Sequence, residues 1–251
     1  MKNSTMFPKF LKGIAVFLFW LCVWYIVAAF ISKEIFLPFP HTVLHRFVIL
    51  CKTAEFWTTV VISLWRIIRG FFYGVVLGFL IALLTHYVPF ANAIISPFLR
   101  TVRAVPVVSF ILLAFLWLDN DAIPVFIALL MVMPIIWENI SAGLGALDKG
   151  LTEMAKVYNI PRSKTLSKII VPQLYPYFYS GALTSLGLAW KSGIAAEVIS
   201  YPTIAIGKAM NNAKITLDTA EVLVWTATVV ALSMIFELVI KLLFKRAGNK
   251  I

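Results

Sequence analysis

Acidic residues are scarce in this chain of 251 residues, and cysteine and histidine are rarer still. There are 11 Asp and Glu, 2 Cys and 3 His. Cys22 and Cys51 lie far apart in the sequence and imply no disulfide framework. His41 and His45 have the i, i+4 spacing of a metal site on a helix, but no third ligand lies nearby. The shortage of ligands argues against a metal centre.

Motifs of nucleotide binding and hydrolysis are missing from the sequence as well. It has no Gly-x-x-x-x-Gly-Lys-Ser/Thr segment to hold phosphates, no Gly-x-Ser-x-Gly and no His-Glu-x-x-His. Paired carboxylates at helical spacing do not occur in the apolar spans, and no basic patch is interleaved with aromatic residues for nucleic acid. We therefore expect neither an enzyme nor a nucleic-acid-binding protein, and no cofactor bound by this chain.

Apolar residues, by contrast, are abundant. They make up 61% of the chain, and its mean hydropathy is +0.94, whereas a soluble domain has about 45–50% apolar residues. This predicts an all-α, polytopic membrane helix bundle with six transmembrane helices. The predicted spans are Gly13–Ile31, Gly70–Tyr87, Ala104–Leu118, Ala122–Ile140, Tyr175–Ile199 and Val222–Phe244. The first is longer than the apolar core of a signal peptide, about 7–15 residues.

The distribution of Lys and Arg orients these spans. Fourteen fall in segments assigned to the cytoplasm, including Lys2, Lys9 and Lys250 near the termini, and five fall in external loops. Because cytoplasmic loops carry the excess of basic residues, the sequence predicts a multi-pass protein of the cell membrane with both termini in the cytoplasm. We expect residues 1–55 to hold the first helix and an external connection, and residues 56–251 to form the core.

The connections have their own patterns. In the external segment Ser32–Thr58, apolar residues spaced from Leu44 to Cys51 predict a short amphipathic helix. Val88–Arg103 should return through the cytoplasm, and Ser200–Glu221 should form a polar external loop. Glycines at every fourth position, Gly70, Gly74 and Gly78, should let another helix approach closely.

Two arginines precede these glycines. Phe56–Arg69 is predicted to be an interfacial lead-in to the second span, with Arg66 and Arg69 at i, i+3 as anchors that extend their charges to the interface. The alternative is that the two arginines attract anions electrostatically.

The segment Leu151–Pro172 is the most informative stretch of the chain. Met154, Val157 and Tyr158 form one apolar face of a short helical run, Asn159 can take the left-handed conformation that ends a helix, and Pro161 prevents continuation. A second short apolar run follows, which Pro172 should close. Neither half reaches the roughly 20 residues of a span, so this basic, amphipathic pair is typical of a docking surface.

This segment resembles the cytoplasmic loop of permease subunits in ATP-binding-cassette importers. Their pattern is Glu-Ala-Ala, three residues, Gly, nine residues, Ile-x-Leu-Pro. Here it reads Glu153-Met154-Ala155, Asn159 and Ile169-Ile170-Val171-Pro172, with the spacing kept and Met154, Asn159 and Val171 replacing Ala, Gly and Leu. Ser63–Leu83 also resembles a helix of the nitrate, sulfonate and taurine permeases, and the resemblance extends from about Leu37 to the C-terminus.

The resemblance implies a type I importer permease fold with a cytoplasmic coupling helix in the loop 148–172. It further implies a homodimeric or pseudo-dimeric pore, an ATPase dimer that uses the ATP, and an external solute-binding protein. The residues implied to contact the ATPase are Glu153, Met154, Ala155, Val157, Tyr158, Asn159, Ile169 and Pro172. The solute would be nitrate-, sulfonate- or taurine-like, or a related small organic solute such as a vitamin precursor.

Ionisable residues inside spans are candidates for the solute pathway, because burying a charge in a bilayer is costly. Lys191, Glu138 and Glu197 are the candidates to line the pathway or hold a gate. Lys191 lies deep in the fifth predicted span, and its alternative is a structural pair with Glu138 or Glu197. Ala195-Ala196-Glu197 resembles a recurrent feature of the sulfonate and taurine permeases. The competing functional class is a self-contained, ion-coupled secondary transporter, which would need ion-coupling carboxylates and an inverted repeat; neither is evident by eye.

Overall fold

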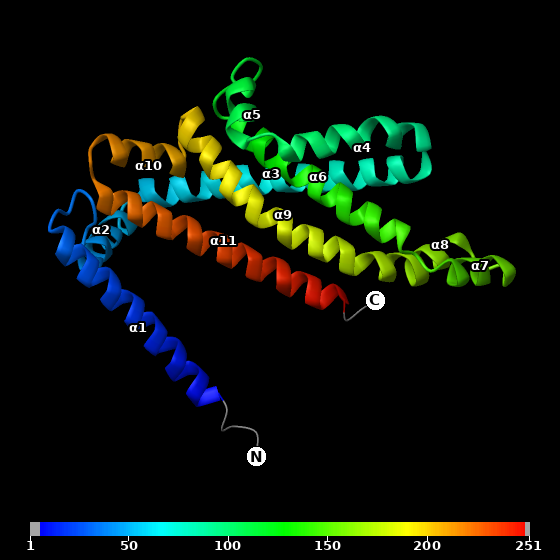
Figure 1. The fold of residues 1–251 in the computed structure, drawn as a ribbon, viewed down its shortest axis with the longest axis horizontal. Helices are drawn as coiled ribbons and strands as arrows, with labels where there is room; N and C mark the ends of the chain where they lie inside the picture. Colours follow the sequence, from blue (N-terminus) through cyan, green and yellow to red (C-terminus); the bar gives the residue numbers. More distant parts are fainter. Residues whose placement is uncertain (1–5, 249–251) are drawn as a thin grey trace. The chain divides into compact units, whose positions relative to one another are not determined.

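The computed structural model describes the backbone of residues 6–248 and the side chains of residues 12–246, and all of its regular structure is helical (Figure 1). Lys2, Lys9 and Lys250, counted above as cytoplasmic charges, lie outside the described side chains. The helices are α1 Met6–Ile31, α2 Pro40–Cys51, α3 Ala54–Tyr87, α4 Pro89–Ala104, α5 Val107–Ala114, α6 Ile123–Gly145, α7 Lys149–Val157, α8 Arg162–Thr165, the π-helix Leu166–Ile170, α9 Val171–Ser200, α10 Ile206–Ile215 and α11 Thr219–Gly248.

Four helical stretches within residues 6–248 are long and apolar enough to cross a membrane. They are Lys12–Ile31, Ala54–Tyr87, Ile123–Gly145 and Thr219–Arg246. The pair α4 and α5, bent by 102°, supplies a fifth if it counts as one span. Helix α9 is 30 residues long but less apolar, because Lys191, Glu197 and several serines interrupt it.

The chain forms two compact units. One comprises the chain as far as Thr58 together with Ala209–Thr228, and the other comprises Thr59–Lys208 and the chain from Val229 onward. In the smaller unit, Arg46 of α2 pairs with Asp218 at 2.9 Å and with Glu221 at 2.7 Å. These contacts join α2 to the first turn of α11. The short helix predicted over Leu44–Cys51 is confirmed, as part of α2.

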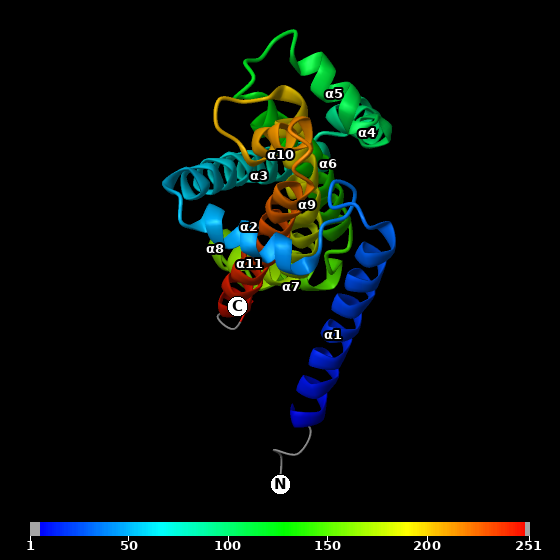
Figure 2. The same ribbon diagram turned by 90° about the vertical axis from the view of Figure 1, so that its left-hand side faces the viewer.

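The larger unit is built on α6. The glycines of α3 face it, as their spacing predicted: a Cβ at Gly70, Gly74 or Gly78 would lie 2.5–2.6 Å from an atom of α6. Helix α6 also packs against α4, α5 and α9, and it lies next to α4 and α9 in Figure 2. A Cβ at Gly181 of α9 would lie 2.9 Å from Asn139 of α6. Close backbone approach therefore holds the centre of this unit together.

The third predicted span is wrong in its position. Val88–Arg103, expected to be a cytoplasmic return, is mostly the helix α4, while Ala104–Leu118 holds only the short helix α5. Pro89 explains the start of α4, since proline fits the first turn of a helix. Pro106 explains its end, because the preceding residue, Val105, is held extended at φ −76°, ψ 134°.

Other connections also differ from expectation. Phe56–Arg69 is no separate lead-in but part of the unbroken helix α3, and Ser200–Glu221 contains the helix α10. Pro172 does not close the second run of the 148–172 loop. Instead it lies in the first turn of α9, directly after the π-helix Leu166–Ile170. The wider π turn accommodates a proline that would otherwise clash with a preceding carbonyl.

Candidate functional site

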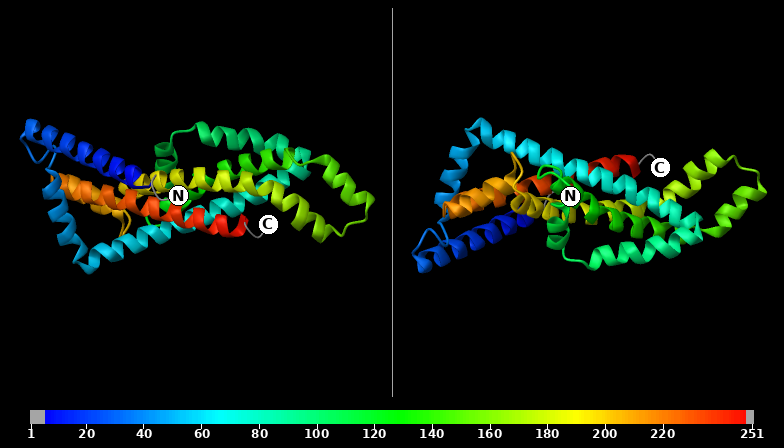
Figure 3. Two further views of the ribbon diagram at one scale, coloured as in Figure 1. Left: turned by 90° about the horizontal axis from the view of Figure 1, so that it is seen from below. Right: turned by 90° about the horizontal axis from the view of Figure 1, so that it is seen from above.

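Local interactions shape the α7–α8 segment. The side chain of Asp148 accepts hydrogen bonds from the backbone N–H groups of Gly150 at 2.7 Å and Leu151 at 3.3 Å, which caps the start of α7. After α7, Asn159 takes the left-handed conformation, with φ 51°, as its residue type predicted. Pro161 then begins the turn into α8. Figure 3 shows α7 and α8 projecting beyond the other helices of the larger unit.

Apolar side chains on this segment face outward. Val157 is 76% exposed, Tyr158 75% and Met154 41%, whereas Ala155 is buried at 2%. Glu153 is exposed and makes no ion pair with any residue that the structure describes. Ile169 lies half-buried in the π-helix, and Pro172 lies half-buried in α9. An apolar surface on a protruding segment is typical of an interaction site.

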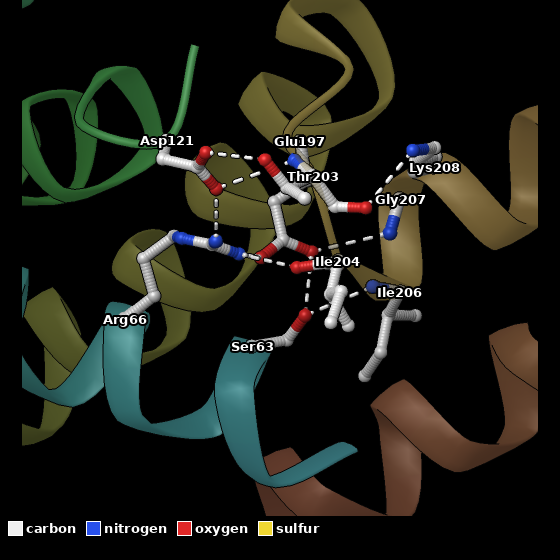
Figure 4. Close-up of polar contacts among 9 residues, drawn as sticks. All are labelled: Ser63, Arg66, Asp121, Glu197, Thr203, Ile204, Ile206, Gly207 and Lys208. Carbon is white, nitrogen blue, oxygen red and sulfur yellow. Dashed lines mark hydrogen bonds and ion pairs between the residues drawn. The ribbon is translucent and has the colours of Figure 1, made fainter. Parts of the chain in front are cut away.

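At the opposite end of the larger unit, Arg66, Asp121 and Glu197 form a cluster, hereafter the ion-pair cluster (Figure 4). The Arg66 guanidinium lies 2.9 Å from Glu197 Oε1 and 2.7 Å from Asp121 Oδ1. It also donates a hydrogen bond to the carbonyl of Ile204 at 3.1 Å. Helix α3, the turn before α6, α9 and the chain after α9 are thereby joined at one arginine.

Neighbouring polar groups complete the cluster. Ser63 Oγ donates to Glu197 Oε2 at 2.9 Å and accepts from the N–H of Ile206 at 2.9 Å, while the Gly207 N–H donates to Glu197 Oε2 at 3.1 Å. Thr203 Oγ1 donates to Asp121 Oδ2 at 2.8 Å. Glycine is required at 207, because a Cβ there would lie 2.4 Å from the backbone nitrogen of Val198.

Burial separates the members of this cluster. Glu197 is fully buried and the side chain of Arg66 is 5% exposed, whereas that of Asp121 is 51% exposed. The expectation that Arg66 is a snorkelling anchor, or an attractant for anions, is therefore wrong, since its charge is held by two carboxylates inside the protein. Buried charges are found where such partners neutralise them. Arg69 is exposed, and its role as an anchor stays a prediction.

The two pairings considered for Lys191 are not formed. Glu197 pairs with Arg66, and Glu138 pairs with Arg103. Lys191 is exposed and has no ion pair among the described residues. Glu197 is fully buried while Lys191 and Glu138 are exposed, and a role of any of the three along the solute pathway stays a prediction.

Sequence reasoning missed Asp121, Ser63 and Arg103. Asp121 falls between two predicted spans, and Arg103 falls in the predicted cytoplasmic connection. The available signal was Arg66 itself, because a cation within an apolar helix requires a partner. The partner could not be identified from sequence, since Asp121 and Glu197 lie 55 and 131 positions away.

An all-helical chain with several helices apolar enough to cross a bilayer is a polytopic membrane protein. Its fold matches the crystal structure of an amino acid ABC transporter with histidines, with a TM-score of 0.62 over 81% of this chain and 97% of that one, at 17% identity. The taurine transport system permease protein TauC of Escherichia coli is 24% identical over 90% of this chain and 84% of its own length. The bicarbonate transport system permease protein CmpB of Synechococcus elongatus is 28% identical over 61% of this chain and 55% of its own length.

Residues 74–249 match the family of binding-protein-dependent transport system inner membrane components, and the chain belongs to this family. The resemblance drawn from the 148–172 loop is thus confirmed. The protein is a multi-pass permease subunit of an ATP-binding-cassette importer in the cell membrane, and its function is transport rather than catalysis. An ATPase and a solute-binding protein are its partners.

Proposed function

We propose that this chain, as a homodimer, forms the translocation pathway of the importer and that the segment α7–α8 is the element that docks on the ATPase. The exposed apolar face of Met154, Val157 and Tyr158 carries this proposal. Met and Tyr adapt well to partner surfaces, and the buried Ala155 permits close packing beneath them. ATP would be bound by the partner, whose closure would move this segment and bias the pore between two states.

A six-span topology suits this function. We assign spans to α1, α3, the bent pair α4–α5, α6, α9 and α11, which places α7–α8 and both termini in the cytoplasm. Within the larger unit, α3 and α6 run opposite to α4 and α9, in keeping with alternating spans (Figure 1). Moving Arg100 and Arg103 from a cytoplasmic loop into α4 leaves twelve basic residues inside against five outside, which still favours this orientation.

The solute we propose is small and is delivered by the external binding protein. The named relatives transport bicarbonate and taurine, and nitrate, other sulfonates or a vitamin precursor fit the same scaffold. Lys191 and Glu138 are our candidates for residues along the pathway, because both are exposed on the helices that surround the centre of the larger unit.

Two substitutions test the docking role. Glu153→Lys and Tyr158→Ser should each weaken co-purification of the ATPase, by about tenfold or more for the tyrosine, since exposed aromatic residues are frequent hot spots of interfaces. Leu116→Ser, which alters an apolar residue 71% exposed at the other end of the unit, is the matched control. Normal ATPase retention in both loop variants would refute the assignment.

A vesicle assay separates the importer from an ion-coupled secondary transporter. Uptake of labelled solute should require the ATPase and ATP. Uptake that continues without the ATPase, driven by an ion gradient, would support the secondary transporter instead.

A further inference from the structure

A polar cavity of about 370 Å³ lies between α3, α4 and α6. Pockets for small molecules have volumes of about 300–1,000 Å³. Most of the lining residues can form hydrogen bonds; they are Thr85, His86, Asn92, Ser96, Arg100, Trp137, Glu138 and Ser141. Thr85 and His86 belong to the last turn of α3, so the cavity lies in the cytoplasmic half of the proposed topology.

The charges at this cavity leave one cation without a partner. Glu138, which lines the cavity, is paired with Arg103, which does not. The side chain of Arg100, one turn earlier on α4, makes no ion pair or hydrogen bond with any of residues 12–246. The charge that remains available to a ligand is therefore positive.

Two hydroxyl groups that line the cavity also differ in whether they have a hydrogen-bond partner. Thr85 Oγ1 accepts a hydrogen bond from Trp137 Nε1 at 3.0 Å and donates to the carbonyl of Ile81 at 2.9 Å. Ser141 Oγ is buried and has no hydrogen-bond partner among the described residues. Because a buried polar atom without a partner costs free energy, Ser141 is available to a ligand, whereas Thr85 is already engaged.

We propose that this cavity binds the oxyanion group of the transported solute, such as a sulfonate or bicarbonate. The inference rests on the proposed function, in which solute passes through this subunit. The planar guanidinium of Arg100 can hold two oxygens of such a group at once. Ser141 donates to the remaining oxygen, and His86 and Asn92, which also line the cavity, can donate further hydrogen bonds.

Glu138 sets the strength of this site. A carboxylate beside a bound anion weakens binding even when Arg103 neutralises most of its charge. Weak binding suits transport, because the solute has to leave the site after entering it. A cationic solute is disfavoured, since Arg100 would repel it and Glu138 would have to give up Arg103.

Calorimetric titration of the purified permease–ATPase complex in lipid nanodiscs tests the site with sodium ethanesulfonate, sodium bicarbonate and choline chloride. One or both oxyanions should bind, and choline should not. Arg100→Gln should weaken binding by about 10- to 100-fold and Ser141→Ala by about 2- to 10-fold, as expected for charged and neutral hydrogen bonds. The affinity of Arg100→Lys should lie between those of Arg100→Gln and the unaltered chain, because lysine keeps the positive charge but lacks the paired N–H donors of the planar guanidinium.

Arg69→Gln is the matched control, because Arg69 is an exposed arginine of the same unit that does not line the cavity. It should bind as the unaltered chain does. The proposal is overturned if neither oxyanion binds, if choline binds equally well, or if Arg100→Gln and Ser141→Ala bind normally. ATPase retention is measured on the same preparations, so loss of this site is distinguished from failure of the importer assignment.

Discussion

The ion-pair cluster buries charges, whereas the α7–α8 segment exposes apolar side chains. Around Arg66, every charge has partners on other elements, and Glu197 is closed off from solvent. Around Tyr158, the side chains reach away from the rest of the larger unit, and Glu153 has no ion pair among the described residues. One region is complete within the chain, and the other is suited to a second protein.

This difference tells how each region should respond to change. A buried charge that loses its partner cannot be rescued by water, so damage to the cluster should unfold the protein. An exposed apolar residue contributes little to the fold of its own chain, so damage to α7–α8 should impair assembly and leave stability nearly intact. Substitutions in the ion-pair cluster and in the α7–α8 segment test whether the first affects stability and the second assembly.

The largest effect is expected at Glu197. Glu197→Ala removes the buried carboxylate that pairs with Arg66 and should destabilise the protein by about 3–5 kcal/mol, as breaking buried ion pairs does. Thermal unfolding of the purified chain in detergent, with the yield of monodisperse protein, measures the loss.

Glu237→Ala provides the control for Glu197→Ala. Glu237 pairs with Lys241 one turn away, and both side chains are nearly half exposed. Its loss should cost about 1 kcal/mol or less. Equal destabilisation of the two variants would show that burial does not distinguish the cluster.

A second, smaller effect is expected where α3 meets α6. In Gly78→Ala the new Cβ would lie 2.5 Å from the carbonyl oxygen of Met133, so a helix has to shift, at a cost of about 1–3 kcal/mol. Gly187→Ala, where no atom lies within 4 Å, should be neutral or slightly stabilising. Unfolding temperatures of the pair should differ accordingly, and equal values would contradict the close contact.

Much of the fold could be predicted from the sequence, because the features concerned are local. The apolar runs predicted the long helices, and the four-residue repeat from Gly70 to Gly78 predicted the close contact with another helix. The predicted helix ends were wrong at some prolines, because a proline can either begin a helix or end the preceding one. Pro172 was expected to close a run and instead lies in the first turn of α9, and Pro89 begins α4 within the stretch expected to be a connection, whereas Pro106 does separate two helices.

For the candidate sites, too, local features could be predicted from the sequence and long-range contacts could not. The turn at Asn159 follows from its own residue type and from Pro161, and it was predicted. The cluster depends on which distant residues meet, and neither the pairing of Arg66 with Asp121 nor that of Arg103 with Glu138 has a local signal. For Lys191 the sequence left open the solute pathway or a carboxylate partner, and the tertiary structure pairs both candidate carboxylates with arginines.

The smallest effect is expected at Asn159. Substitutions there test whether the loop between α7 and α8 is independent of the ion-pair cluster. With φ at 51°, this residue has a conformation that glycine adopts freely, asparagine tolerates and β-branched residues avoid. Asn159→Gly, which restores the residue of the family pattern, should change stability by about 0.5 kcal/mol or less, whereas Asn159→Val should cost about 1–2 kcal/mol. Hydrogen exchange should show that the valine variant loosens only α7 and α8, while the amides of α9 near Glu197 keep their protection. Loss of protection at both ends would mean that the loop and the cluster form a single cooperative unit, and the division between them would fail.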